Sequence, residues 1–182
     1  MLRRDIARTY QLMEGNLVKR WVDCARSPGV QAVVVLRFGQ WLYTQNTVVR
    51  LLLTMVYVVA NFLIKTLWGI ELGRRAQIGE GFYIGHFSGI FVAPESKIGK
   101  NCNISQGVTI GVSGQGERRG CPTIGDNVYL APGAKVFGRI TIGNNVKIGA
   151  NAVIYRDIPD NATVVLDPGY KIISMSGQKS SE

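Results

Sequence analysis

The stretch from Glu71 to Ile90 decides the fold; it reads Glu-Leu-Gly-Arg-Arg-Ala-Gln-Ile-Gly-Glu-Gly-Phe-Tyr-Ile-Gly-His-Phe-Ser-Gly-Ile. Within it an aliphatic residue returns every six positions, and the same step recurs in two further runs that end at Ile154. The series is Leu72, Ile78, Ile84 and Ile90, then Ile98, Ile104 and Ile110, then Ile124, Leu130, Val136, Ile142, Ile148 and Ile154. Gly commonly follows the aliphatic residue and permits a tight backbone bend there.

A period of six fits neither an α-helix, which repeats about every 3.6 residues, nor the alternation of a single strand. It is typical of a hexapeptide β-helix, in which short parallel strands coil around a core of aliphatic side chains. Because three hexapeptides make one triangular turn of about eighteen residues, we expect roughly four or five turns.

The period breaks twice, between residues 90 and 98 and between residues 110 and 124. The second break contains the loop 112–122, which reads Val-Ser-Gly-Gln-Gly-Glu-Arg-Arg-Gly-Cys-Pro. A Gly-rich loop with two adjacent arginines cannot continue the strand pattern. Since loops that interrupt a regular scaffold often carry function, we expect part of the functional site here.

The chain is basic, with 21 Lys and Arg against 12 Asp and Glu and a formal net charge of +9. This excess is typical of proteins that meet an anionic partner, such as a membrane surface or a phosphate-rich small molecule, although solubility alone would also explain it. No nucleic-acid-binding motif accompanies the charge, which argues against a nucleic-acid partner.

The three cysteines, Cys24, Cys102 and Cys121, have no metal-type spacing and are interpreted as free thiols in a reducing cytoplasm. The amino-terminal residues lack the apolar core and cleavage site of a signal peptide, which argues against secretion. The sequence therefore predicts a cytoplasmic protein.

The first 69 residues predict helices. Residues 1–26 read as one amphipathic helix; Ser27-Pro28-Gly29 breaks it, and residues 30–45 carry an apolar stripe that Arg37 interrupts. Asn46-Thr47 is a candidate cap for a third helix, about 48–68. This organisation predicts a helical region 1–69, a β-helix domain 70–158 and an extension 159–182 with a disordered end.

The third helix is the most apolar part of the chain, with fourteen uncharged residues between Arg50 and Lys65. A membrane-spanning helix needs about 20 apolar residues, and this run also contains Asn61, so we do not expect it to span. Packing between subunits and contact with a membrane interface both remain open, the first being favoured.

His86 is the single histidine, and it lies within the repeat. An imidazole can take a proton from a hydroxyl in one step and return it in the next, although most solitary histidines are surface or structural residues. Glu71 lies fifteen residues earlier, about one turn below and three positions further round. Its carboxylate could orient the imidazole, or it could simply be solvated.

Several motifs resemble the serine acetyltransferase family of the hexapeptide-repeat, left-handed β-helix superfamily. They are Ser27-Pro-Gly-Val-Gln-Ala32, Gly69-Ile-Glu71, His86-Phe-Ser-Gly89, Gln106-Gly-Val-Thr-Ile-Gly111, Pro122-Thr-Ile-Gly125, Gly133-Ala-Lys-Val136 and Lys147-Ile-Gly-Ala-Asn-Ala152. The resemblance implies a left-handed parallel β-helix preceded by helices, assembled as a homotrimer or a dimer of trimers.

The resemblance also implies roles for individual residues. His86 would be the general base that activates an acceptor hydroxyl for attack on acetyl-CoA, with Glu71 steadying the imidazolium. Acetyl-CoA would lie between subunits, and the matching positions are Gly111, Val112, Pro132, Ala150 and Lys147. Lys147 and Lys171 are candidates for the CoA phosphates. No metal ion is required.

The acceptor is predicted from the places where this chain departs from the family. The family holds serine with an Asp before the catalytic His and with an Arg-His pair before the loop's final Pro. In this chain those positions are Gly85, Gly120 and Cys121. Arg118 and Arg119 lie nearby and could replace one contact. The loss of three charged partners, together with Phe87 beside the histidine, favours a neutral sugar acceptor.

The leading hypothesis is therefore an O-acetyltransferase of the exopolysaccharide and capsule subgroup. It is expected in the cytoplasm, and association with the inner face of the plasma membrane is left open. Serine O-acetylation is the alternative. A zinc hydratase of the same fold needs three histidines from two subunits, which one histidine per chain cannot supply. A purely structural solenoid would explain the repeats but neither the loop nor His86.

Overall fold

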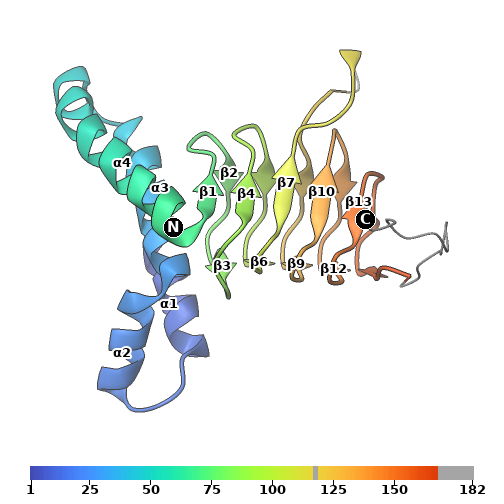
Figure 1. The fold of residues 1–182 in the computed structure, drawn as a ribbon, viewed down its shortest axis with the longest axis horizontal. Coiled ribbons are helices and arrows are strands. Elements are labelled where there is room, and N and C mark those ends of the chain that lie inside the picture. The colour runs from blue at the N-terminus through green and yellow to red at the C-terminus, as the bar shows by residue number, and fades with distance from the viewer. Residues whose placement is uncertain (117–118, 168–182) are drawn as a thin grey trace, which may run out of the picture.

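The computed structural model describes residues 1–116 and 119–167, in which four helices precede a long solenoid of short strands (Figure 1). The helices form an upright arm at one end of the solenoid, and the successive turns then stack away from it. The helices are α1 (Leu2–Leu12), α2 (Leu17–Arg26), α3 (Pro28–Leu42) and α4 (Thr47–Trp68).

The single helix predicted over residues 1–26 is wrong, because α1 and α2 are separate helices. Gly15 between them adopts a φ of +111°, which an α-helix cannot contain. Asn16 then caps α2, since its Oδ1 accepts a hydrogen bond from Lys19 N at 2.9 Å. The predicted cap at Asn46 is confirmed: its Oδ1 accepts from Val49 N at 3.0 Å.

Parallel strands build the three faces of the solenoid, each named here as a sheet. Sheet A has the order β1-β4-β7-β10-β13, sheet B β11-β8-β5-β2, and sheet C β14-β12-β9-β6-β3. The strands are β1 (Ile70–Leu72), β2 (Gln77–Ile78), β3 (Tyr83–Ile84), β4 (Ile90–Val92), β5 (Lys97–Ile98), β6 (Asn103–Ile104), β7 (Thr109–Gly111), β8 (Thr123–Ile124), β9 (Tyr129–Leu130), β10 (Lys135–Phe137), β11 (Thr141–Ile142), β12 (Lys147–Ile148), β13 (Val153–Ile154) and β14 (Thr163–Val164).

The aliphatic repeat forms the core as predicted, and its members are buried along the whole solenoid. The position of the first break, however, differs from the prediction. Leu72 pairs with Val92, twenty residues on, and Val92 pairs with Ile110, eighteen residues on. The two extra residues therefore lie between Ile84 and Val92, in the segment that contains His86.

Local geometry explains this displaced break. Ser88 and Gly89 both adopt positive φ values, +88° and +65°, so the backbone bulges at this corner before it returns to sheet A. Ile90 and Val92 are then both buried, and Ile90 N donates to Gly69 O at 3.0 Å. Because either aliphatic residue could fill the core position, the sequence alone did not choose between them.

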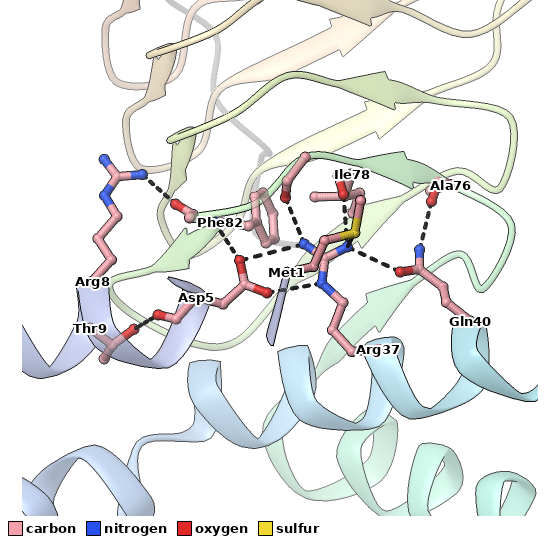
Figure 2. A network of polar contacts seen from close by, with 11 residues as sticks. Met1, Asp5, Arg8, Thr9, Arg37, Gln40, Ala76, Ile78 and Phe82 are labelled. Atoms are coloured by element: carbon pink, nitrogen blue, oxygen red, sulfur yellow. Dashed lines mark hydrogen bonds and ion pairs between the residues drawn. The ribbon is translucent and has the colours of Figure 1, made fainter. Parts of the chain in front are cut away.

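A buried ion pair joins the helices to the first turn of the solenoid (Figure 2). Arg37 Nε donates to Asp5 Oδ2 at 2.9 Å, and its other nitrogens donate to Ile78 O at 2.7 Å and Gly79 O at 2.6 Å. Asp5 Oδ1 accepts from Phe82 N at 2.9 Å. The arginine that interrupts the apolar stripe of α3 is thus the link between α1, α3 and the solenoid.

Replacement of Arg37 by Ala should lower the free energy of unfolding by about 3–5 kcal/mol, because it leaves the Asp5 carboxylate buried without its cation. Arg4→Ala is the matched control. Arg4 pairs with Glu80 at the surface, and its loss should cost less than about 1 kcal/mol. Urea unfolding followed by circular dichroism measures both variants; equal costs would show that the buried pair does not anchor the helices.

Candidate active site

Four turns stack into one edge of the solenoid, where sheet C passes into sheet A. We call it the His86 edge; it comprises residues 85–89, 105–108, 131–134 and 149–152. Backbone hydrogen bonds link each turn to the next. Gly107 N donates to Ser88 O at 2.8 Å, Gly133 N to Gln106 O at 2.9 Å, and Asn151 N to Pro132 O at 2.9 Å. The edge is therefore a continuous, rigid column.

His86 is exposed on this edge, in the bulged turn between β3 and β4. The neighbouring Phe87 packs edge-on against Trp68, with ring centroids 5.3 Å apart. Trp68 is the last residue of α4, and its Nε1 donates to Gln31 Oε1 at 3.0 Å. The end of α4 thus positions the histidine turn while leaving the imidazole open to solvent, as a general base requires.

Glu71 lies in β1 on sheet A, where Phe91 is its partner in the next turn. This turn contains twenty residues, so Phe91 is the residue directly above Glu71. His86 therefore lies five positions before the residue above Glu71, whereas a turn of eighteen residues predicted three. Lys65 Nζ donates to Glu71 Oε1 at 2.7 Å. No contact of Glu71 with His86 occurs among the described residues, so their pairing stays a prediction.

The residues predicted to bind acetyl-CoA fall into two groups. Pro132 and Ala150 lie on the His86 edge, and Lys147 projects from sheet C two residues before that edge begins. Gly111 and Val112 lie at the other end of the sheet A strands, where β7 ends. Lys171 lies outside the described residues.

The second edge of sheet A carries the predicted loop, and we call it the loop edge. It consists of the turns that lead from sheet A to sheet B, including loop 112–122, which projects from the solenoid in Figure 1. Ser113 and Gly120 close the base of the loop through two hydrogen bonds, at 3.1 and 3.0 Å. Arg119 is exposed above this base, and Arg118 lies outside the described residues.

Cys121, near the end of the loop, lies against Glu95, with Sγ 3.8 Å from Oε2. Burial raises the pKa of the Cys121 thiol, and deeper burial raises the pKa of Cys102 to about 11. Neither thiol is therefore an activated nucleophile. Within one chain, Cys121 and Arg119 lie across sheet A from Gly85, His86 and Phe87, so the predicted substrate residues are divided between two edges.

Sequence reasoning overlooked two polar residues in the turns that follow the histidine turn. The Oε1 atom of Gln106 is buried without a hydrogen-bond partner, in the turn directly above the histidine turn. Lys135 Nζ donates to Thr109 Oγ1 at 3.1 Å and to Gly107 O. A buried carbonyl oxygen without a hydrogen-bond donor costs free energy. Gln106 is therefore a candidate to accept a hydrogen bond from a ligand or a water. Both residues belong to motifs that also carry the family resemblance.

The described residues contain no group of three or more His, Cys, Asp or Glu side chains that could hold a metal ion.

Residues 121–156 match the sequence profile of the bacterial transferase hexapeptide (six repeats). The serine acetyltransferase of Synechococcus elongatus is 39% identical over 150 residues, which are 82% of this chain and 59% of that protein. The chain is thus similar to hexapeptide-repeat transferases over residues 121–156 and to a serine acetyltransferase over 150 residues.

Solved structures extend the likeness to nearly the whole chain. The serine acetyltransferase of Neisseria gonorrhoeae in complex with serine has a TM-score of 0.74 and 27% identity, over 92% of this chain and 65% of that one. The Brucella abortus enzyme in complex with coenzyme A has a TM-score of 0.74 and 28% identity, over 97% and 67%. The predicted fold, a left-handed parallel β-helix preceded by helices, is confirmed.

The prediction of a sugar acceptor is wrong, because these relatives are serine acetyltransferases and not polysaccharide enzymes. The prediction gave most weight to the three charged positions replaced by Gly85, Gly120 and Cys121. It named Arg119 as a replacement for only one contact, and it did not consider Lys135 on sheet A. The chain spans only 59% of the length of the Synechococcus elongatus protein.

Proposed function

We propose that this chain catalyses the transfer of acetyl from acetyl-CoA to the hydroxyl of L-serine. The observation that carries the proposal is the likeness to serine acetyltransferases over 82% of the chain, together with an exposed His86 on a rigid edge. This reaction needs a base beside the acceptor, a groove for the thioester and cations for phosphate and carboxylate groups. His86 is the candidate base, and Arg119 and Lys147 are the candidate cations.

In the proposed reaction His86 removes the proton from the serine Oγ as the oxygen attacks the thioester carbonyl. The new C–O bond forms and the C–S bond breaks, and the imidazolium returns the proton to the departing thiolate. Glu71 is a positioning residue that stabilises the imidazolium once its carboxylate turns from Lys65. Lys147 is a candidate for the CoA phosphates, and Arg119 is a candidate for the carboxylate of serine.

A homotrimer would complete the site. One protomer presents His86 and loop 112–122 on opposite edges of sheet A, so neither edge holds every group that the reaction needs. If three solenoids pack around a common axis, the loop edge of one protomer meets the His86 edge of the next. Gly111, Val112 and Arg119 would then face Pro132, Ala150 and Lys147 across the subunit boundary.

His86→Ala should lower kcat for serine acetylation by about 10²–10⁴, because it removes the general base. The assay follows loss of the thioester absorbance of acetyl-CoA with L-serine as acceptor. Lys97→Ala, an exposed substitution on sheet B, is the matched control and should leave kcat unchanged. Failure of the wild-type protein to acetylate serine would overturn the proposed function.

Glu71→Gln should lower kcat at least about tenfold while leaving the KM for acetyl-CoA unchanged, because a positioning carboxylate acts on the imidazolium and not on substrate binding. Lys65→Met should not lower kcat, since it only frees the carboxylate from its present partner. Steady-state kinetics separates the two variants. A fall in kcat in Lys65→Met equal to that in Glu71→Gln would instead assign the ion pair a structural role.

Mixed trimers test the shared site. His86→Ala and Arg119→Ala protomers, each impaired alone, should recover about a quarter of wild-type activity when mixed equally, because some sites then combine two intact edges. His86→Ala mixed with Ala150→Glu is the matched control, since both substitutions fall on the His86 edge. That mixture should recover nothing, and equal recovery in both would contradict a site between protomers.

A further inference from the structure

The outer face of α4 is apolar and uncovered. Ten large apolar side chains, each 46–74% exposed, project from it, and between Arg50 and Lys65 the helix has no charge. We define this α4 outer face as Val48, Leu51, Leu52, Met55, Val56, Val58, Val59, Phe62, Leu63 and Leu67. Contiguous apolar surface of this extent marks a site of interaction with a protein or a membrane.

The inner side of α4 shows how little of the helix is packed. Tyr57 and Ile64 are buried on the side towards α3, and they are the only buried residues of the helix. A neighbouring helix covers one stripe of a helix surface, about 100° wide. The α4 outer face covers most of the remaining circumference, so one further helix from a second copy would leave much of it in water. A lipid environment would cover all of it.

The apolar surface continues onto the neighbouring helices. A groove of about 560 Å³ joins Trp21 of α2 and Val34 of α3 to Leu63 and Leu67 of α4. Trp41 at the end of α3 is 46% exposed. Tryptophan side chains on such a surface are typical of the boundary between lipid headgroups and hydrocarbon, where an apolar ring with a polar N–H is favoured.

Charge favours an anionic surface as the partner. The helical region 1–69 contains nine Lys and Arg residues and three Asp and Glu residues. Arg50 and Lys65 flank the charge-free run of α4. Basic residues around an apolar helix face are typical of helices that bind anionic lipid headgroups and bury their apolar side chains beneath them.

By length and composition α4 is the one helix among the described residues that could cross a membrane, with 22 residues and a mean hydropathy of 2.0 in its most apolar window. Its inner side argues against a spanning position. The guanidinium of Arg74 lies 4.5 Å from the ring centroid of Tyr57, near the middle of α4, and Arg74 Nε donates to Gly39 O at 2.8 Å. Spanning would bury this cation in hydrocarbon, which is costly.

We propose that the protein binds the surface of an anionic membrane through the α4 outer face, which lies within the interface and does not cross the bilayer. This membrane contact is separate from the chemistry of His86, because the outer face and the His86 edge share no residue. Membrane binding is therefore measured without turnover, and its failure would leave the proposed acetyl transfer untouched.

Flotation of the full-length protein with phosphatidylcholine vesicles containing phosphatidylglycerol tests the proposal. The wild-type protein should float with these vesicles, and binding should weaken in pure phosphatidylcholine and in high salt. Leu51→Glu with Leu52→Glu should weaken binding at least about tenfold, since both leucines lose their burial in lipid. Val165→Glu with Leu166→Glu is the matched control, because these exposed apolar residues lie on the last solenoid turn; its binding should equal wild type.

Two outcomes of this experiment would overturn the proposal. The first is absence of vesicle binding by the wild-type protein, or equal loss in both double variants. The second is a mass by light scattering that is that of an oligomer in the wild-type protein and falls in the Leu51 and Leu52 variant, with no vesicle binding by either protein, which would assign the face to a contact between copies of the chain.

A thiol placed at the tip of the α3–α4 hairpin tests the interfacial position. Thr44→Cys in a Cys121→Ser background should react with a membrane-impermeant maleimide added outside the vesicles, because the tip stays on the solenoid's side. Cys24 and Cys102 are buried and should react slowly. Protection of the tip thiol until detergent is added would show that α4 crosses the bilayer, contradicting the interfacial position.

Discussion

Hydrogen bonds between successive turns are the constraint on which the rest of this structure depends. Each short strand pairs in parallel with the strand one turn away, and two or three residues per strand leave no freedom to slip, since a shift of one residue would turn the aliphatic side chains out of the core. Steps of eighteen, twenty and twenty-six residues all preserve this pairing. Residues beyond the eighteen of a regular turn therefore lie in the corner turns between strands, where His86 and loop 112–122 are found.

A second constraint orients the helical region. The Arg37–Asp5 pair is buried and also bonds to the backbone of the first turn, so α1 and α3 are fixed against the solenoid (Figure 2). Because α4 packs on α3 and leads directly into β1, the same contact places Trp68 against Phe87 and Lys65 beside Glu71. A buried ion pair far from His86 thus helps to determine the surroundings of the histidine.

The solenoid and the helical region each leave a surface that one chain cannot complete. Sheet A separates the His86 edge from the loop edge, which is the reason to propose assembly around a common axis. The α4 outer face exposes apolar side chains over most of a helix, which is the reason to propose a lipid partner. The two surfaces lie in different parts of the chain, so an enzyme site and a membrane contact are compatible.

The sequence by itself determined the solenoid, its core residues, the projecting loop and the helix cap at Asn46, because each depends on a repeat or on short-range chemistry. It did not determine the register around His86, since Ile90 and Val92 are equally suited to the core and only pairing with Leu72 distinguishes them. The break between α1 and α2 rests on short-range chemistry at Gly15 and Asn16 and was overlooked in the sequence. The sequence could not show that Arg37 is paired or that the site is divided between two edges, because those features depend on contacts between residues distant in sequence, which only the tertiary structure decides.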